Sequence, residues 1–111
     1  MSAVVPEGVT ELSREYSFQG CEKLETVTLP SSLEVIGSEV FSWCSSLRGE
    51  LTLPDSLKRI EGYAFYECSK LESIHFATAS SLLEFVHEEA FKGCKPSAIP
   101  SDIIKKWNLV F

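Results

Sequence analysis

Four cysteines are the residues most able to do chemistry in this chain of 111 residues: Cys21, Cys44, Cys68 and Cys94. No two of them form the C-x-x-C pair of a zinc site, so we expect no metal ligands among them. At equivalent points of stacked repeats their Cα atoms would lie about 5 Å apart, within disulfide range, but parallel Cβ vectors disfavour a bridge. We therefore favour buried free thiols that pack as small apolar groups.

The other candidates for catalysis are two histidines and one pair of carboxylates. Neither His75 nor His87 has a serine or cysteine nucleophile beside it in a recognisable catalytic arrangement. Glu88 and Glu89 are adjacent, so their side chains point in different directions, unlike an acid and a base that face one bond. No glycine-rich phosphate loop occurs in the sequence. The sequence therefore predicts neither an enzyme nor a cofactor site.

The charge balance narrows the class of partner. Sixteen acidic and ten basic residues give a formal net charge of −6, which repels phosphate backbones and anionic lipid. We therefore expect no nucleic-acid binding and no membrane-surface role. No apolar run approaches the roughly 18 to 20 residues of a membrane-spanning helix, and the first residues, MSAVVPEGVTEL, lack the pattern of a signal peptide. A single soluble domain over residues 1–111 is the expectation.

A repeat of about 24 residues positions the cysteines. A phenylalanine precedes each cysteine by three residues, and these phenylalanines recur at intervals of 23, 24 and 26 residues: Phe18, Phe41, Phe65 and Phe91. An alternating apolar pair after each of the first three cysteines predicts a strand, at Val27 and Leu29, Leu51 and Leu53, and Ile74 and Phe76. A second apolar stretch opens at Leu33, Leu57 and Leu83 and continues three residues later at Ile36, Ile60 and Val86.

One such unit cannot bury its own apolar side, whereas copies stacked in register share a continuous core. The repeat therefore predicts an α/β-type solenoid that is mostly β, with about four units. Strands at equivalent points would form a parallel sheet, and the phenylalanines would form a ladder through the interior. The expected units are residues 9–32, 33–56, 57–82 and 83–98, with a C-terminal cap at residues 99–111.

The segments LETVTLPSSLEVIGSEVFSWCSSL and LTLPDSLKRIEGYAFYECSKLESI resemble BspA-like leucine-rich repeats, and the resemblance covers most of the chain. It implies a right-handed stack of coils with parallel strands on two sides and short turns. It also implies adhesion or ligand binding, commonly on surface proteins of bacteria and some parasitic protists. A cell-surface or secreted location is the corresponding expectation.

Three departures from the repeat predict local irregularities. One extra residue lies between Leu47 and Leu51, and the stretch IHFATASS lacks the Leu-Pro step that ends the earlier strands. We expect the third junction to bulge outward there. The tail, IPSDIIKKWNLVF, is expected to begin with a strand-like segment at Ile99 and then to cover the open end of the stack with its apolar residues.

Strand alternation predicts a binding face, because the residues between the buried positions point outward. This face is polar and somewhat acidic, and its candidate residues are Glu25, Thr26, Thr28, Arg48, Glu50, Thr52, Glu72, Ser73 and His75. We expect one ladder of Thr28, Thr52 and His75, with Thr26, Glu50 and Ser73 beside it. A second possible contact zone is aromatic and comprises Tyr16, Trp43, Tyr63, Tyr66 and Phe85.

The favoured hypothesis is a module that binds a protein ligand, with adhesion to a host or extracellular protein as its most specific form. The alternative is a structural segment that associates with itself through its open coil ends. A solvated sheet face without a ligand accounts for any single one of the outward residues equally well.

Overall fold

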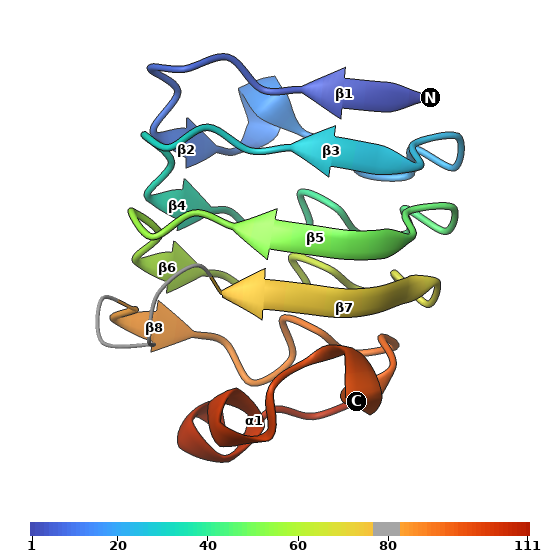
Figure 1. Ribbon diagram of the computed structural model, residues 1–111, viewed down its shortest axis with the longest axis vertical. Coiled ribbons are helices and arrows are strands. Elements are labelled where there is room, and N and C mark those ends of the chain that lie inside the picture. Colours follow the sequence, from blue (N-terminus) through green and yellow to red (C-terminus); the bar gives the residue numbers. More distant parts are fainter. Residues whose placement is uncertain (77–82) are drawn as a thin grey trace.

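The protein is a right-handed coil of short parallel strands (Figure 1), and the computed structural model describes residues 1–76 and 83–111. The strands are β1 (Ser2–Val4), β2 (Glu11–Leu12), β3 (Thr26–Thr28), β4 (Val35–Ile36), β5 (Gly49–Leu53), β6 (Arg59–Ile60), β7 (Leu71–Phe76) and β8 (Phe85–Val86). From β1 to β7 the chain makes about three turns, a minor difference from the four units expected. The predicted mostly-β solenoid is confirmed.

The coil has two sides with strands. The even-numbered strands form one parallel sheet in the order β2-β4-β6-β8, which we call the narrow face. Its inward residues lie in one register and are buried: Leu12, Ile36, Ile60 and Val86. The odd-numbered strands are longer and lie on the other side, which we call the wide face (Figure 1).

Unlike the narrow face, the wide face is divided into two sheets. Strand β1 pairs with β3, and β5 pairs with β7, but no ladder joins β3 to β5, all of whose residues are described. One hydrogen bond still connects the starts of β3 and β5, from the Arg48 N–H to the Glu25 carbonyl at 3.0 Å. Gly49 follows Arg48 in the sequence and has a φ of 73°, a left-handed conformation that suits glycine. The extra residue therefore coincides with the division.

The phenylalanine ladder is present as predicted. Successive rings are stacked nearly parallel, with centroids 5.4, 5.1 and 5.2 Å apart along the series Phe18, Phe41, Phe65 and Phe91. The last three rings are fully buried, whereas Phe18 is half-buried and stacks on one neighbour only. These rings join the leucine, isoleucine and cysteine side chains of all the coils in one core.

All four cysteines are free thiols; Cys44, Cys68 and Cys94 are buried as predicted, whereas Cys21 is only half-buried. Each inner thiol also donates to the carbonyl of a phenylalanine one coil earlier: Cys44 to Phe18 at 3.1 Å, Cys68 to Phe41 at 3.0 Å and Cys94 to Phe65 at 3.1 Å. The recurring Phe-x-x-Cys motif thus places one ring in the ladder and one thiol against the preceding coil.

The tail covers one end of the stack. A 3-10 turn, η3 (Pro96–Ala98), leads into helix α1 (Ser101–Trp107), and Ile103 and Leu109 are buried against the core. Asp102 in the first turn and two lysines in the last suit the helix dipole, and Asn108 closes the helix with a φ of 53°. The prediction of a strand-like segment at Ile99 is wrong. Ile99 is buried with extended backbone, but it is in no strand and a helix follows it.

The expected outward bulge at IHFATASS falls mainly on residues 77–82 and lies outside the described residues.

Candidate functional site

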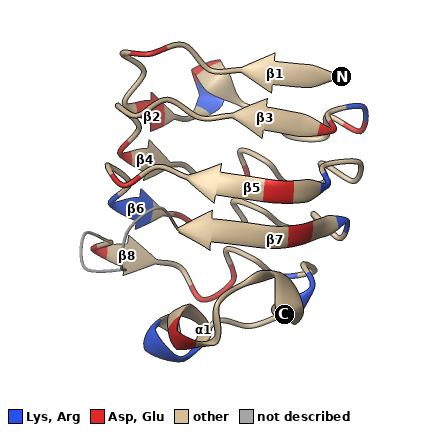
Figure 2. Ribbon diagram, in the orientation of Figure 1, with Lys and Arg blue, Asp and Glu red and all other residues tan. Residues whose placement is uncertain are grey.

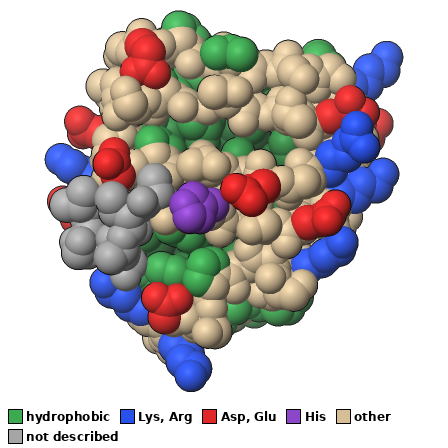
Figure 3. Space-filling model, in the orientation of Figure 1, with side chains coloured by type: hydrophobic (Ala, Val, Ile, Leu, Met, Phe, Trp, Pro, Cys, Tyr) green, Lys and Arg blue, Asp and Glu red, His purple; other side chains and the backbone are tan. Residues whose placement is uncertain are grey.

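All nine predicted binding residues lie on or beside the wide face, the side viewed in Figure 3. Seven of them are exposed, and Glu25 and Ser73 are half-buried. Acidic residues occur on both β5 and β7 (Figure 2), which correspond to Glu50 and Glu72. The geometry therefore presents the predicted residues to solvent together.

The predicted rows are only partly continuous. Thr52 lies opposite His75 and Glu50 lies opposite Ser73 within the β5–β7 pair. Residues Thr26 and Thr28, however, pair with β1, opposite Ser2 and Val4. The division between β3 and β5 interrupts each expected three-strand ladder at this point.

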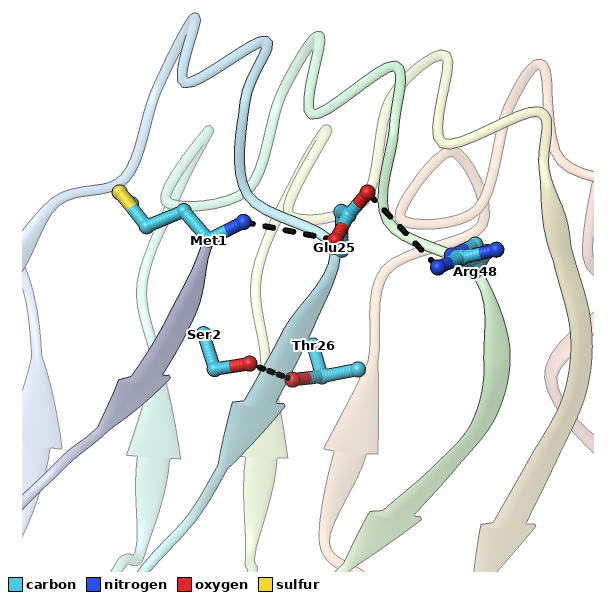
Figure 4. A network of polar contacts seen from close by, with 5 residues as sticks. All are labelled: Met1, Ser2, Glu25, Thr26 and Arg48. Carbon is cyan, nitrogen blue, oxygen red and sulfur yellow. Dashed lines mark hydrogen bonds and ion pairs between the residues drawn. The ribbon is translucent and has the colours of Figure 1, made fainter.

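The starts of the first three long strands are linked by surface contacts (Figure 4). The Glu25 carboxylate lies 3.4 Å from the Met1 amino group and 3.7 Å from the Arg48 guanidinium. The Thr26 hydroxyl donates to the Ser2 hydroxyl at 2.7 Å. These ionic side chains are about half exposed, so each pair contributes at most about 1 kcal/mol to stability. Two of the nine residues are thus already engaged with each other.

A groove of about 620 Å³ lies where β3 and β5 separate. It is lined by both strands and by the turns that follow β1, β3 and β5: Glu7, Thr26, Val27, Thr28, Leu29, Ser31, Glu50, Thr52, Pro54 and Asp55. Apolar side chains are visible at the bottom of a hollow in this part of the wide face (Figure 3). Val27 and Leu29 are only half-buried, although their counterparts Leu51 and Leu53 are buried.

The groove is an acceptor-rich environment. Three of its residues are carboxylates and four are hydroxyls, and none is basic. Ser31 donates to Glu7 from its hydroxyl at 2.7 Å and from its backbone N–H at 3.1 Å. These two hydrogen bonds lower the pKa of Glu7. The groove therefore suits a ligand with hydrogen-bond donors and positive charge.

Sequence reasoning missed the contribution of Glu7, Ser31 and Asp55. They lie in turns rather than at outward strand positions, and only the separation of β3 from β5 makes them line a common groove. The signal in the sequence was the extra residue between Leu47 and Leu51, which marks the interrupted junction.

The aromatic zone is only partly assembled. Tyr66 packs edge-to-face against both Trp43 and Tyr63, with centroids 5.5 and 5.2 Å apart, and Trp43 is 51% exposed. Phe85 belongs to a different group, under the Arg59 guanidinium and beside Trp107. The hydrogen bond from the Tyr63 hydroxyl to Glu89 raises the pKa of Tyr63.

Several turns in this region have left-handed backbone conformations. The residue two positions after each ladder phenylalanine has a positive φ in every coil, and these residues are Gly20, Trp43, Glu67 and Gly93. Side chains other than glycine are strained there by roughly 1 to 2 kcal/mol. The two middle coils therefore carry large side chains at a position where the outer coils have glycine.

Burial disfavours the reactive thiolate form of the three buried cysteines, and His87 is engaged by the backbone. Burial raises the pKa of Cys44 to about 11 and that of Cys94 to about 12, and it raises the pKa of Cys68 as well. The Nδ1 atom of His87 accepts from the Glu89 N–H at 3.0 Å. Among residues 1–76 and 83–111, no group of three His, Cys, Asp or Glu side chains could hold a metal ion.

Within the described part of the chain, no helix is both long enough and apolar enough to span a lipid bilayer.

Comparison with known proteins agrees with the architecture. The family model for the BspA type leucine rich repeat region, with six copies, matches residues 2–105. No curated protein and no solved structure matches the chain. The matched span includes every strand, the phenylalanine ladder and most of α1. The chain therefore belongs to the BspA-type leucine-rich repeat family.

Proposed function

We propose that the protein is a binding module whose wide face engages a protein ligand, and that it has no catalytic role. The observation that carries the proposal is the gathering of nine outward residues, seven of them exposed, on one face around an open groove. The family supports a repeat scaffold of the kind that often serves protein interaction. Several weak contacts spread over successive strands would supply the affinity.

Adhesion to an extracellular or host protein is the more specific form of this proposal. It is supported by the family resemblance, and a cell-surface or secreted location would accompany it. The net charge of −6 favours a partner with a basic surface, because opposite charge speeds association and suppresses wrong partners.

The test is a comparison of immobilised variants rather than capture alone. Purified extracellular-matrix proteins and cell lysate are passed over the wild-type protein, Thr52→Arg and Glu72→Lys, with Glu84→Lys beside the narrow face as the matched control. Loss of the same partner from both wide-face variants, but not from the control, would support the proposal. Equally tight retention of every partner by Thr52→Arg and Glu72→Lys would overturn it.

Self-association through the coil ends is the alternative function. The cap bears on it, because α1 and the residues after it already cover the C-terminal end with buried Ile103 and Leu109. Sedimentation over a wide range of protein concentration separates the two functions. A mass that grows with concentration, and that falls back in Trp107→Glu, would favour self-association over ligand binding.

A further inference from the structure

We propose that the groove between β3 and β5 binds the guanidinium group of an arginine on an extended segment of the partner. This inference rests on the proposed function and names the chemistry of the partner at that face. It stands on four features of the groove: an open strand edge, hydroxyls that are already committed as donors, carboxylates without ion pairs, and an apolar floor.

The first feature is the open edge of β3. The Thr28 carbonyl accepts from the Val5 N–H at 3.0 Å, so the backbone groups of Thr28 point toward β1. Since backbone groups alternate along a strand, those of Val27 and Leu29 point toward β5, to which no ladder connects them. Strand edges of this kind present both N–H groups and carbonyl oxygens to a ligand, and a guanidinium group can donate to the carbonyl oxygens.

The second feature is that two of the four hydroxyls that line the groove are already committed as donors. Thr26 donates its proton to Ser2, and Ser31 donates its proton to Glu7, both at 2.7 Å. Each oxygen keeps lone pairs, so it can accept from a ligand but cannot donate to one. Guanidinium has five N–H donors and no acceptor, and it therefore matches a lining of this kind.

The third feature is charge. Glu7, Glu50 and Asp55 lie around the groove, and none of the ion pairs within residues 1–76 and 83–111 includes any of them. Glu7 is held in place by Ser31, which favours its ionised form. A bound cation would thus meet carboxylates that are not neutralised by other side chains of the described residues.

The fourth feature is the floor. Val27 and Leu29 pack against the core but stay half-buried, at the junction where no ladder joins β3 to β5. Arginine has three methylene groups that pack on apolar surface while its charged end reaches polar groups. The floor and the acceptors together fit one long basic side chain better than a small ammonium ion or a neutral polar group.

The experiment measures binding of three blocked tripeptides, Ac-Gly-Xaa-Gly-amide, in which Xaa is arginine, lysine or citrulline. Citrulline has nearly the shape of arginine but no charge. In ¹H–¹⁵N spectra of the full chain, the arginine peptide should shift the amide signals of Val27, Leu29 and Thr52 in a saturable way. The citrulline peptide should bind at least about tenfold more weakly, as expected for loss of a charge-assisted contact.

The variants Glu50→Gln and Asp55→Asn keep the side-chain shapes and remove the charges, and each should weaken arginine-peptide binding several-fold. Glu84→Gln, beside the narrow face and outside the groove lining, is the matched control and should bind as the wild type does. Equal binding of the citrulline or lysine peptide would overturn the assignment, as would unchanged binding by Glu50→Gln with Asp55→Asn.

The two proposals can fail separately. Loss of the captured partner from Thr52→Arg, together with its full retention by Glu50→Gln and Asp55→Asn, would leave the binding face in place and reject the arginine groove. Conversely, arginine-peptide binding in the groove with no effect of Thr52→Arg or Glu72→Lys on any partner would reject the proposed function and keep the groove.

Discussion

The narrow and wide faces are built from the same repeat, but one is continuous and the other is divided. On the narrow face, the four two-residue strands form one continuous sheet. The longer strands of the wide face form two separate pairs, with a groove between them. The difference begins at the single extra residue before Leu51, which the chain accommodates through the left-handed conformation of Gly49.

The packing of the core determines how the coils stack, and the strands on each face adapt to that stacking independently of the other face. Phe18 and Phe41 stack at 5.4 Å between the two coils whose wide-face strands, β3 and β5, are divided. An irregularity on one face therefore leaves both the interior and the opposite face in register.

The largest loss of stability is expected from a substitution in the core that both faces share. Phe65→Ala removes a fully buried ring that is stacked on both sides, and it should lower the free energy of unfolding by about 3 to 5 kcal/mol. Urea denaturation followed by circular dichroism measures this. Phe18→Ala, which removes a half-buried ring with one stacking neighbour, is the control and should cost less. An unchanged midpoint for Phe65→Ala would contradict the shared ladder.

The buried thiols should make the free energy of unfolding depend on pH in the alkaline range. Burial raises the pKa of Cys44 and Cys94 above the ordinary value of 9.0, to about 11 and about 12, so the folded state holds these protons more tightly. Their contribution is complete below pH 9 and is lost as the pH rises toward 11 to 12. Denaturation at several pH values measures the decline, and Cys44→Ala should reduce it. Stability that is constant across this range would refute the prediction.

Deleting Gly49 should make the wide face resemble the narrow one. The deletion restores the spacing found between Leu24 and Val27, so β3 and β5 should join and the groove should close. Each new hydrogen bond should add about 1 kcal/mol, and the Val27 amide should exchange with solvent more slowly. Hydrogen exchange measured by NMR tests this. Exchange that is as fast as in the wild type would mean that the extra residue is not what separates the strands.

A milder change at the same position distinguishes the effect of backbone strain from the effect of the extra residue on strand register. Gly49→Ala keeps the extra residue, and a Cβ atom there meets no atom within 4 Å, so only the φ of 73° opposes it. The expected loss is about 1 kcal/mol, with the groove retained. Thermal unfolding measures the loss, and binding of the arginine peptide checks the groove.

The smallest effect concerns the contacts between strand starts. Glu25→Gln removes the charge that faces Met1 and Arg48, and it should change stability by less than about 1 kcal/mol because the groups are about half exposed. The change should shrink further at high salt. A loss of several kcal/mol that persists in high salt would show that this surface pair holds the first coils together.

Periodicity made the interior predictable, because every coil must bury equivalent residues. The positions of the phenylalanines and cysteines predicted the ladder and the free thiols, and alternation correctly placed residues such as Thr52 and His75 opposite each other. These features repeat, so a single sequence contains several copies of the evidence for each.

Features that occur once were harder to predict. The division of the wide face depends on how the chain takes up one residue, and the groove depends on turn residues such as Asp55 that acquire a role only through it. The terminal helix was missed because its seven residues give little periodic signal. Its boundaries become clear from the backbone at Pro100 and Asn108.

The left-handed turn after each phenylalanine shows where this repeat can vary. Two coils have glycine there, while Trp43 and Glu67 occupy the same place in the others without disturbing the rings beside them. A substitution at this position changes the side chain that is exposed to solvent, and it lowers the stability by only about 1 to 2 kcal/mol. Selection could therefore diversify the exterior of successive coils one residue at a time, while the packing that defines the fold is inherited unchanged.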